Sequence, residues 1–63
     1  MAFAKYTKLS STEMFIEVDY SNGAFGMERV TVRPGRDLFA AAYSAASVKA
    51  TLQGERLERF ARA

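Results

Sequence analysis

The chain has 63 residues, contains neither cysteine nor histidine, and carries a formal net charge of +2. A chain of this length can bury one thin core, so we expect a single domain over residues 1–63. Without cysteine and histidine it lacks disulfides, catalytic thiolates and the commonest zinc ligands, and we expect neither a metal nor another cofactor. Lys5 and Lys8 interrupt any run that resembles a signal peptide, and no stretch approaches the roughly 20 apolar residues that span a bilayer. We therefore expect a cytoplasmic protein with no membrane partner.

Two strands are predicted before residue 21. Phe3–Leu9 mixes aromatic, β-branched and lysine residues, which is typical of a solvent-facing edge strand. Polar residues 10–12 follow as a short connection. Residues 13–20 alternate, with Met14, Ile16, Val18 and Tyr20 on one face and Glu13, Phe15, Glu17 and Asp19 on the other. This alternation predicts a strand with one buried face.

A hairpin is predicted at Asn22-Gly23, because both residue types tolerate a positive φ. Gly26 is a second flexible point, and the chain returns as Met27–Arg33. A loop centred on Gly23 sets Ile16 opposite Val30, Met14 opposite Val32, Glu17 opposite Arg29, and Glu13 opposite Arg33. This register joins apolar with apolar side chains and acidic with basic ones, and we predict it for that reason.

A helix is predicted from Leu38 to about Leu52, after Pro34-Gly35 has ended the third strand and with Asp37 as its N-cap. It carries two apolar stripes, formed by Phe39, Ala42, Tyr43, Ala46 and Ala50 and by Ala41, Ala45, Val48 and Leu52. Lys49 interrupts the face that should be buried, and snorkelling at the helix end is the explanation that the sequence offers.

Gly54 is predicted to end this helix as its C′ residue, and Glu55–Arg62 to form a short second helix. Glu55 with Arg59, and Glu58 with Arg62, would then be i,i+4 ion pairs. The order βββαα predicts the α+β class, with a small antiparallel sheet of two to three strands packed by an alanine-rich helix and a short C-terminal helix.

Residues suited to catalysis are scarce. Histidine and cysteine, the usual general base and thiolate, are missing. Glu17 and Asp19 share a strand face, as paired catalytic carboxylates would, but the predicted register lets them balance Arg29 and Arg33 instead. The glycines lack the spacing of a phosphate-binding loop. We expect no catalytic residues and no enzymatic activity.

Basic residues cluster near the exit of the hairpin. They are Arg29, Arg33 and Arg36, with Lys5 and Lys8 as further candidates. With stacking aromatics such as Phe15, Tyr6 and Phe25, such a strip would bind nucleic acid. The seven aspartate and glutamate residues weigh against a polyanionic partner, because several are predicted to pair with these arginines. A small basic nucleic-acid-binding regulator therefore remains an alternative.

Three aromatic residues lie outside the predicted core pattern. Phe15 is on the charged face of its strand, Phe25 on a loop and Tyr6 on an edge strand. Exposed aromatic rings among basic side chains are typical of hot spots in protein interfaces. The alternative is that the first strand and the loop fold back and bury these rings.

The N-terminal half carries three short motifs: F-A-K-Y at residues 3–6, D-Y-S-N-G at residues 19–23 and R-V at residues 29–30. In order and without a gap, they resemble the first family of type I-F anti-CRISPR inhibitors of bacteriophages. The resemblance implies an antiparallel sheet with two helices and binding to the repeated backbone subunit of the host's RNA-guided surveillance complex. It also implies contact through Tyr6 and Tyr20, with Lys5 beside the first. After Val30 the match ends, because Thr31 stands where the family has glutamate and the family's longer loop and further strand are missing.

These observations together predict a small phage-type anti-CRISPR inhibitor, acting in the host cytoplasm, that binds a type I CRISPR surveillance complex and sterically blocks target DNA. The predicted partner-binding residues are Tyr6, Tyr20, Lys5, Phe15, Arg29 and Arg33. The second alternative is a structural subunit whose two-sided apolar helix packs against a copy of itself, so the predicted state is a monomer or a weak homodimer.

Overall fold

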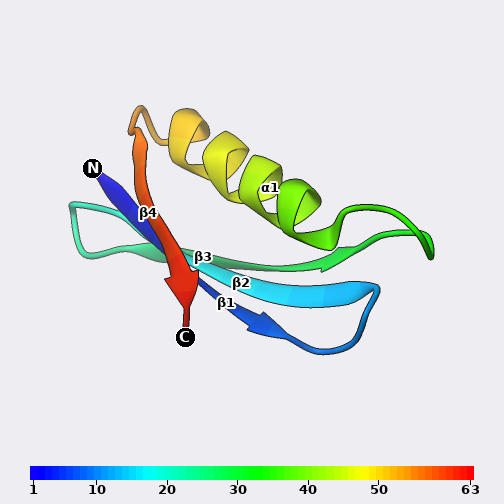
Figure 1. The fold of residues 1–63 in the computed structure, drawn as a ribbon. Coiled ribbons are helices and arrows are strands. Elements are labelled where there is room, and N and C mark those ends of the chain that lie inside the picture. The colour runs from blue at the N-terminus through cyan, green and yellow to red at the C-terminus, as the bar shows by residue number, and fades with distance from the viewer.

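Residues 1–63 are described by the computed structural model, in which one helix packs on one face of a four-stranded sheet (Figure 1). The elements are β1 (Ala2–Lys8), β2 (Glu13–Asp19), β3 (Phe25–Thr31), α1 (Leu38–Leu52) and β4 (Leu57–Arg62). The strand order is β3-β2-β1-β4, with β1 antiparallel to β2, β2 antiparallel to β3, and β4 parallel to β1. The α+β class is confirmed. No helix is long and apolar enough to cross a membrane.

The predicted C-terminal helix is wrong, because residues 57–62 form strand β4, and the element order is βββαβ. The strand pairs with β1 from Ala2 opposite Leu57 to Tyr6 opposite Arg62, with a shift in register between Ala2 and Phe3. A helix of eight residues is marginal by itself, whereas the unpaired side of β1 offers a ladder of backbone hydrogen bonds. The predicted i,i+4 ion pairs of this segment do not form.

Strand β1 is not an edge strand, although Phe3–Leu9 was correctly predicted to be extended. It lies between β2 and β4, and its even-numbered residues Ala2 and Ala4 are buried. The larger Phe3 points to the other face and is exposed. The first half of β1 therefore turns its small alanines to the helix and its phenylalanine to the other face, which is the reverse of the usual size pattern.

The hairpin forms at the predicted place, but its register is shifted by two residues. Asp19 lies opposite Phe25, so the loop comprises residues 20–24 and is centred on Asn22 rather than Gly23. The Asn22 side chain fixes this loop by accepting a hydrogen bond from the Ala24 N–H at 2.9 Å. Ile16 consequently faces Glu28, and Met14 faces Val30. A shift of two residues leaves every side chain on its predicted face.

Both ends of α1 follow the sequence prediction. The Asp37 side chain accepts a hydrogen bond from the Ala40 N–H at 3.0 Å. Gly54 adopts a φ of +71°, while the Gly54 N–H donates to the Thr51 carbonyl and the Glu55 N–H to the Ala50 carbonyl. This pair of bonds is a Schellman motif, which turns the chain back toward the sheet and into β4.

Alanine lets the helix lie close to the sheet. The ten buried residues are Ala2, Ala4, Met14, Ile16, Val18, Val30, Leu38, Ala42, Ala46 and Ala50. On α1 these are spaced four residues apart, so one stripe of the helix faces the core. Lys49, for which the sequence offered only snorkelling, reaches Glu28 of β3, with 3.5 Å between its Nζ and the carboxylate oxygen.

Candidate protein-binding surface

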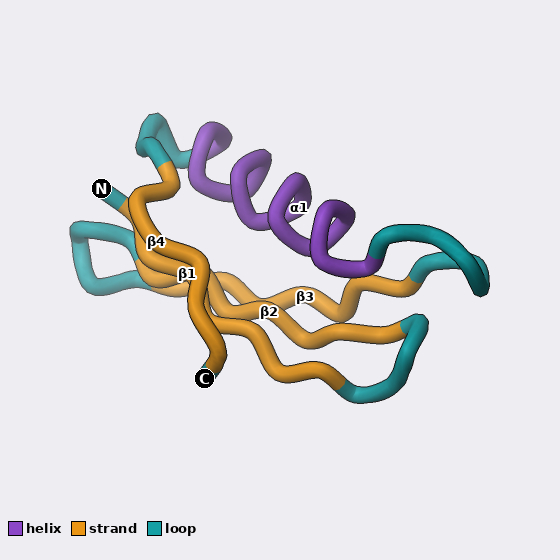
Figure 2. Tube along the Cα trace, viewed as in Figure 1, coloured by secondary structure: helices purple, strands orange, loops and turns teal.

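The face of the sheet opposite α1 is covered by no other element (Figure 2), and we call it the open face. Residues paired across neighbouring strands point to the same side of a sheet, so the register defines its members. They are Phe3, Lys5 and Thr7 of β1, Glu13, Phe15, Glu17 and Asp19 of β2, Phe25, Met27, Arg29 and Thr31 of β3, and Arg59 and Ala61 of β4.

Large apolar side chains are spread across the open face. Phe3 is 48% exposed, Phe25 61% and Met27 50%. Phe15 of β2 is half-buried, and its neighbours across the two ladders are Thr7 and Arg29. A 63-residue chain thus keeps three phenylalanines on a face that has no layer above it, which is characteristic of an interaction surface.

Charged side chains of both signs lie between these apolar residues. The Lys5 ammonium is 3.6 Å from the Asp19 carboxylate, and the Arg29 guanidinium is 3.7 Å from that of Glu13. Arg59 and Glu17 form no ion pair. The open face therefore carries three cations and three carboxylates, without an excess of either sign.

Glu17 and Asp19 lie together on this face, as the alternation predicted. A hydrogen bond to the Asp19 carboxyl raises the pKa of Glu17, and burial and the charge of Asp19 act in the same direction, whereas Lys5 lowers the pKa. Two neighbouring carboxylates repel each other, and a cation placed beside them relieves that repulsion. The arrangement suits a basic side chain of a partner at this point.

An open recess of about 640 Å³ lies beside these carboxylates, where β1 meets β4. It is lined by Phe3, Ala4, Lys5, Arg59, Ala61, Arg62 and Ala63. One phenylalanine and three cations at its border suit an acidic or aromatic side chain of a partner.

The structure brings three of the six predicted contact residues together. Lys5, Phe15 and Arg29 lie on the open face in adjacent strands. Tyr6 and Tyr20 lie on the opposite face, where both are partly buried against the core. Arg33 is exposed in the connection between β3 and α1. The six residues do not form one surface.

Tyr6 belongs to an aromatic cluster beneath α1. Its ring stacks on Phe60 at 5.0 Å and meets Phe39 edge-on at 5.2 Å, and Tyr43 meets Phe60 edge-on at 5.5 Å. Such contacts stabilise a fold by about 0.5–1.5 kcal/mol per pair beyond the area they bury. Tyr6 is therefore a packing residue that joins β1, β4 and the helix.

The large apolar or basic residues of the open face that were not among the predicted contact residues are Phe3, Phe25, Met27 and Arg59. Phe3 is two residues before Lys5, and Met27 two residues before Arg29, so strand periodicity places each on the face of a predicted contact residue. Phe25 was correctly expected to be exposed, although it begins β3 instead of lying on a loop. Nothing in the sequence pattern signalled Arg59, because its segment was predicted to be helical.

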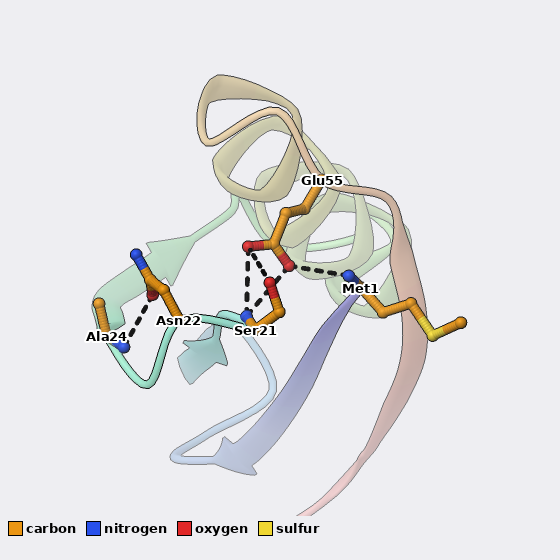
Figure 3. A network of polar contacts seen from close by, with 5 residues as sticks. All are labelled: Met1, Ser21, Asn22, Ala24 and Glu55. Carbon is orange, nitrogen blue, oxygen red and sulfur yellow. Dashed lines mark hydrogen bonds and ion pairs between the residues drawn. The ribbon is translucent and has the colours of Figure 1, made fainter.

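Glu55 connects three parts of the chain at the other end of the sheet (Figure 3). Its carboxylate accepts hydrogen bonds from the Ser21 N–H at 3.2 Å and the Ser21 hydroxyl at 3.1 Å, and it lies 3.0 Å from the Met1 ammonium. The side chain is 13% exposed. The hydrogen bond from the ammonium lowers the pKa of Glu55 most, burial opposes it, and both Ser21 donors add to the lowering.

We expect Glu55→Gln to flatten the dependence of folding stability on acid pH. A folded pKa below the ordinary 4.5 means that the contact stabilises the fold above that pH, and the stabilisation disappears as the pH falls through the folded value. Urea titrations at several pH values between neutral and acidic measure this slope. Glu58→Gln is the matched control, because Glu58 is exposed on β4 and forms no ion pair. Equal slopes for the parent protein and Glu55→Gln would contradict the assignment.

No group of three or more acidic, cysteine or histidine side chains is arranged to hold a metal ion. Comparisons with protein-family models, curated proteins and solved structures found no match to this chain. Evidence for function therefore comes from the geometry of the open face and from the sequence motifs.

Proposed function

We propose that this protein is a non-catalytic binding domain that acts by placing its open face on a partner protein. The observation that carries this proposal is an uncovered sheet face on which Phe3, Phe25 and Met27 are each about half exposed and Phe15 is half-buried. A protein interface of ordinary size buries about 800 Å² per partner, with aromatic residues at its centre and charges at its rim. Binding of this kind blocks a site by occupying it and needs no chemical step.

The charges of the open face favour a protein partner over a nucleic acid. Two of its three cations, Lys5 and Arg29, are engaged by carboxylates on the same face. Phosphate groups would also have to approach Glu17, which has no neutralising ion pair. A protein surface with charges of both signs meets no such repulsion.

The more specific proposal is a phage-type anti-CRISPR inhibitor that binds the backbone subunit of a type I surveillance complex and occludes target DNA. Its support is the ungapped resemblance of residues 3–30 to the type I-F inhibitors. Of the residues that the resemblance implies as contacts, Lys5 lies on the open face, opposite Glu17 on β2. Tyr6 and Tyr20 are partly buried, so this chain would use the neighbouring face of the sheet in place of the tyrosines.

A pull-down from a lysate that contains a type I surveillance complex tests this proposal. The tagged protein is incubated with nuclease and washed at about 0.5 M salt, because phosphate contacts weaken steeply with salt whereas apolar contacts do not. We expect the backbone subunit to be retained under both conditions. Purified surveillance complex that neither binds the protein nor loses DNA binding in its presence would reject the specific target.

The same pull-down distinguishes protein binding from the alternative of nucleic-acid binding. If Arg29, Arg33, Arg36 and the lysines bind DNA or RNA, retention is lost on nuclease treatment, and affinity for an isolated oligonucleotide falls steeply between low and moderate salt. Arg36→Glu serves as a charge-reversal control, since Arg36 is exposed between β3 and α1: it should weaken nucleic-acid binding while leaving the open face unchanged.

A further inference from the structure

Strand β3 has a free edge. The Tyr20 N–H donates to the Ala24 carbonyl and the Val32 N–H to the Thr12 carbonyl, both at 2.9 Å, so the even-numbered residues of β3 direct their backbone groups to β2. The N–H and C=O groups that point away from the sheet are those of Phe25, Met27, Arg29 and Thr31. Proline, lysine and bulges, which usually prevent edge pairing, are absent from the strand, and its two charged side chains, Glu28 and Arg29, are held by ion pairs with Lys49 and Glu13. At the opposite edge, β4 has three charged side chains among six residues and a shift in register.

The helix presents apolar side chains along the same edge. The ion pair between Lys49 and Glu28 shows which flank of α1 lies over β3. Helical spacing puts Ala45 and Leu52 on that flank, with Val48 beside them. Val48 is 55% and Leu52 77% exposed. Exposed apolar residues thus border this edge on both sides of the sheet, since Phe25 and Met27 lie on the open face.

The small core of this chain leaves room for stabilisation by a second copy. Five of its ten buried residues are alanines, and it has no disulfide. Domains below about 70–80 residues commonly supplement so small a core with disulfides, metals or oligomerisation. A regular edge strand with apolar borders is the feature of this structure that a copy of the same chain can extend.

We infer that two copies of the chain associate through antiparallel pairing of their β3 strands, with the two-fold axis at Met27. Axes at Glu28 or Arg29 would set two glutamates or two arginines directly opposite each other, which is destabilising. An axis at Met27 sets Met27 opposite its own copy and Phe25 opposite Arg29 of the second copy, a cation–π pair that occurs twice.

This arrangement makes one eight-stranded sheet with both helices on the same face. A perpendicular two-fold axis keeps equivalent faces on the same side, so the flanks with Val48 and Leu52 face each other. A stable interface of ordinary size buries about 800 Å² per copy, which here would be roughly a fifth of the 4283 Å² surface of the chain. The inference is independent of the partner proposed above, and it would double the open face.

Single-cysteine variants test the register, because the chain has no cysteine of its own. In the Met27→Cys dimer the Cα atoms of the two cysteines would be about 5.5 Å apart, because each lies opposite the other. In the Arg29→Cys dimer the two cysteines would be four residues apart along the strands, which is on the order of 13 Å. With a short bis-maleimide, we expect Met27→Cys to cross-link to a covalent dimer of about twice 7.0 kDa and Arg29→Cys and Phe3→Cys to remain monomeric. Cross-linking of Arg29→Cys in preference to Met27→Cys would overturn the register.

Sedimentation of the unmodified chain and two lysine variants tests the interface itself. We expect a mass that rises from 7.0 kDa toward twice that value with concentration, and at least tenfold weaker association in Met27→Lys. Phe3→Lys is the matched control, because Phe3 has the same exposure as Met27 but lies on the inner strand β1. A mass of 7.0 kDa at millimolar concentration, or a dimer lost only in Phe3→Lys, would overturn the proposal.

Discussion

Ile16→Ala is expected to leave a large share of the protein unfolded at room temperature. Ile16 is fully buried at the centre of β2, beneath the alanine stripe of α1. Removing a large aliphatic side chain from such a site costs about 2–5 kcal/mol through lost burial and the cavity left behind. A domain of 63 residues has a total stability of roughly 3–9 kcal/mol, so the loss is comparable to the whole.

Urea unfolding followed by circular dichroism measures this effect. Ile16→Val is the graded control and should lower the free energy of unfolding by about 0.5–1.5 kcal/mol. Thr31→Val changes an exposed position on β3 and should alter stability by less than about 0.5 kcal/mol. An Ile16→Ala variant with an unfolding midpoint close to that of Ile16→Val would show that the space at this site collapses.

The local pattern was sufficient to predict β2, the hairpin and the helix. In each case the deciding signals are close in sequence: strict alternation in residues 13–19, Asn22 and Gly23 in the turn, and Asp37 and Gly54 at the ends of α1. The register was wrong because the hydrophobic pattern is equally satisfied by a shift of two residues. The choice depends on a hydrogen bond from the Ala24 N–H to the Asn22 side chain, which side-chain polarity alone does not reveal.

Strand β4 and the partners of β1 required contacts between the two ends of the chain. The three apolar residues of Leu57–Arg62 are compatible with one face of a helix and also with a strand. Pairing with residues 2–6 makes the segment a strand. The same distant contact explains why Tyr6 is partly buried. The sequence predicts an exposed residue on an edge strand, but Phe60 of β4 stacks on its ring. Secondary structure that depends on such pairing is set by tertiary context rather than by propensity.

The open face could be predicted in part, because strand periodicity groups Lys5 with Phe3 and Phe15 with Glu17. For β1, the face that the helix covers could not be inferred from residue size. Ala2 and Ala4 belong to the same buried core as Ala42, Ala46 and Ala50 of α1, so small residues on both elements allow a close approach. Phe3, between the two alanines of β1, is on the uncovered side, where it is available for binding.

Phe15→Ala is expected to weaken partner binding at least about 30-fold with little change in stability. Phe15 is the half-buried aromatic residue of the open face, between Thr7 and Arg29, and aromatic hot spots of an interface often contribute about 2 kcal/mol or more, which corresponds to that ratio. Its half-buried ring packs against neighbouring strands but not under the helix, so the fold tolerates its loss better than that of Ile16.

Leu52→Ala and Tyr6→Ala make this binding test specific. Leu52 is exposed at the end of α1, on the other side of the sheet from the open face, and its replacement should leave affinity unchanged. Tyr6→Ala should lower the melting temperature, because it removes two aromatic contacts from the core, and any loss of binding should follow from unfolding. If Phe15→Ala bound normally while a folded Tyr6→Ala protein did not, the contact surface would lie on the helix side of the sheet, as the anti-CRISPR resemblance by itself implies.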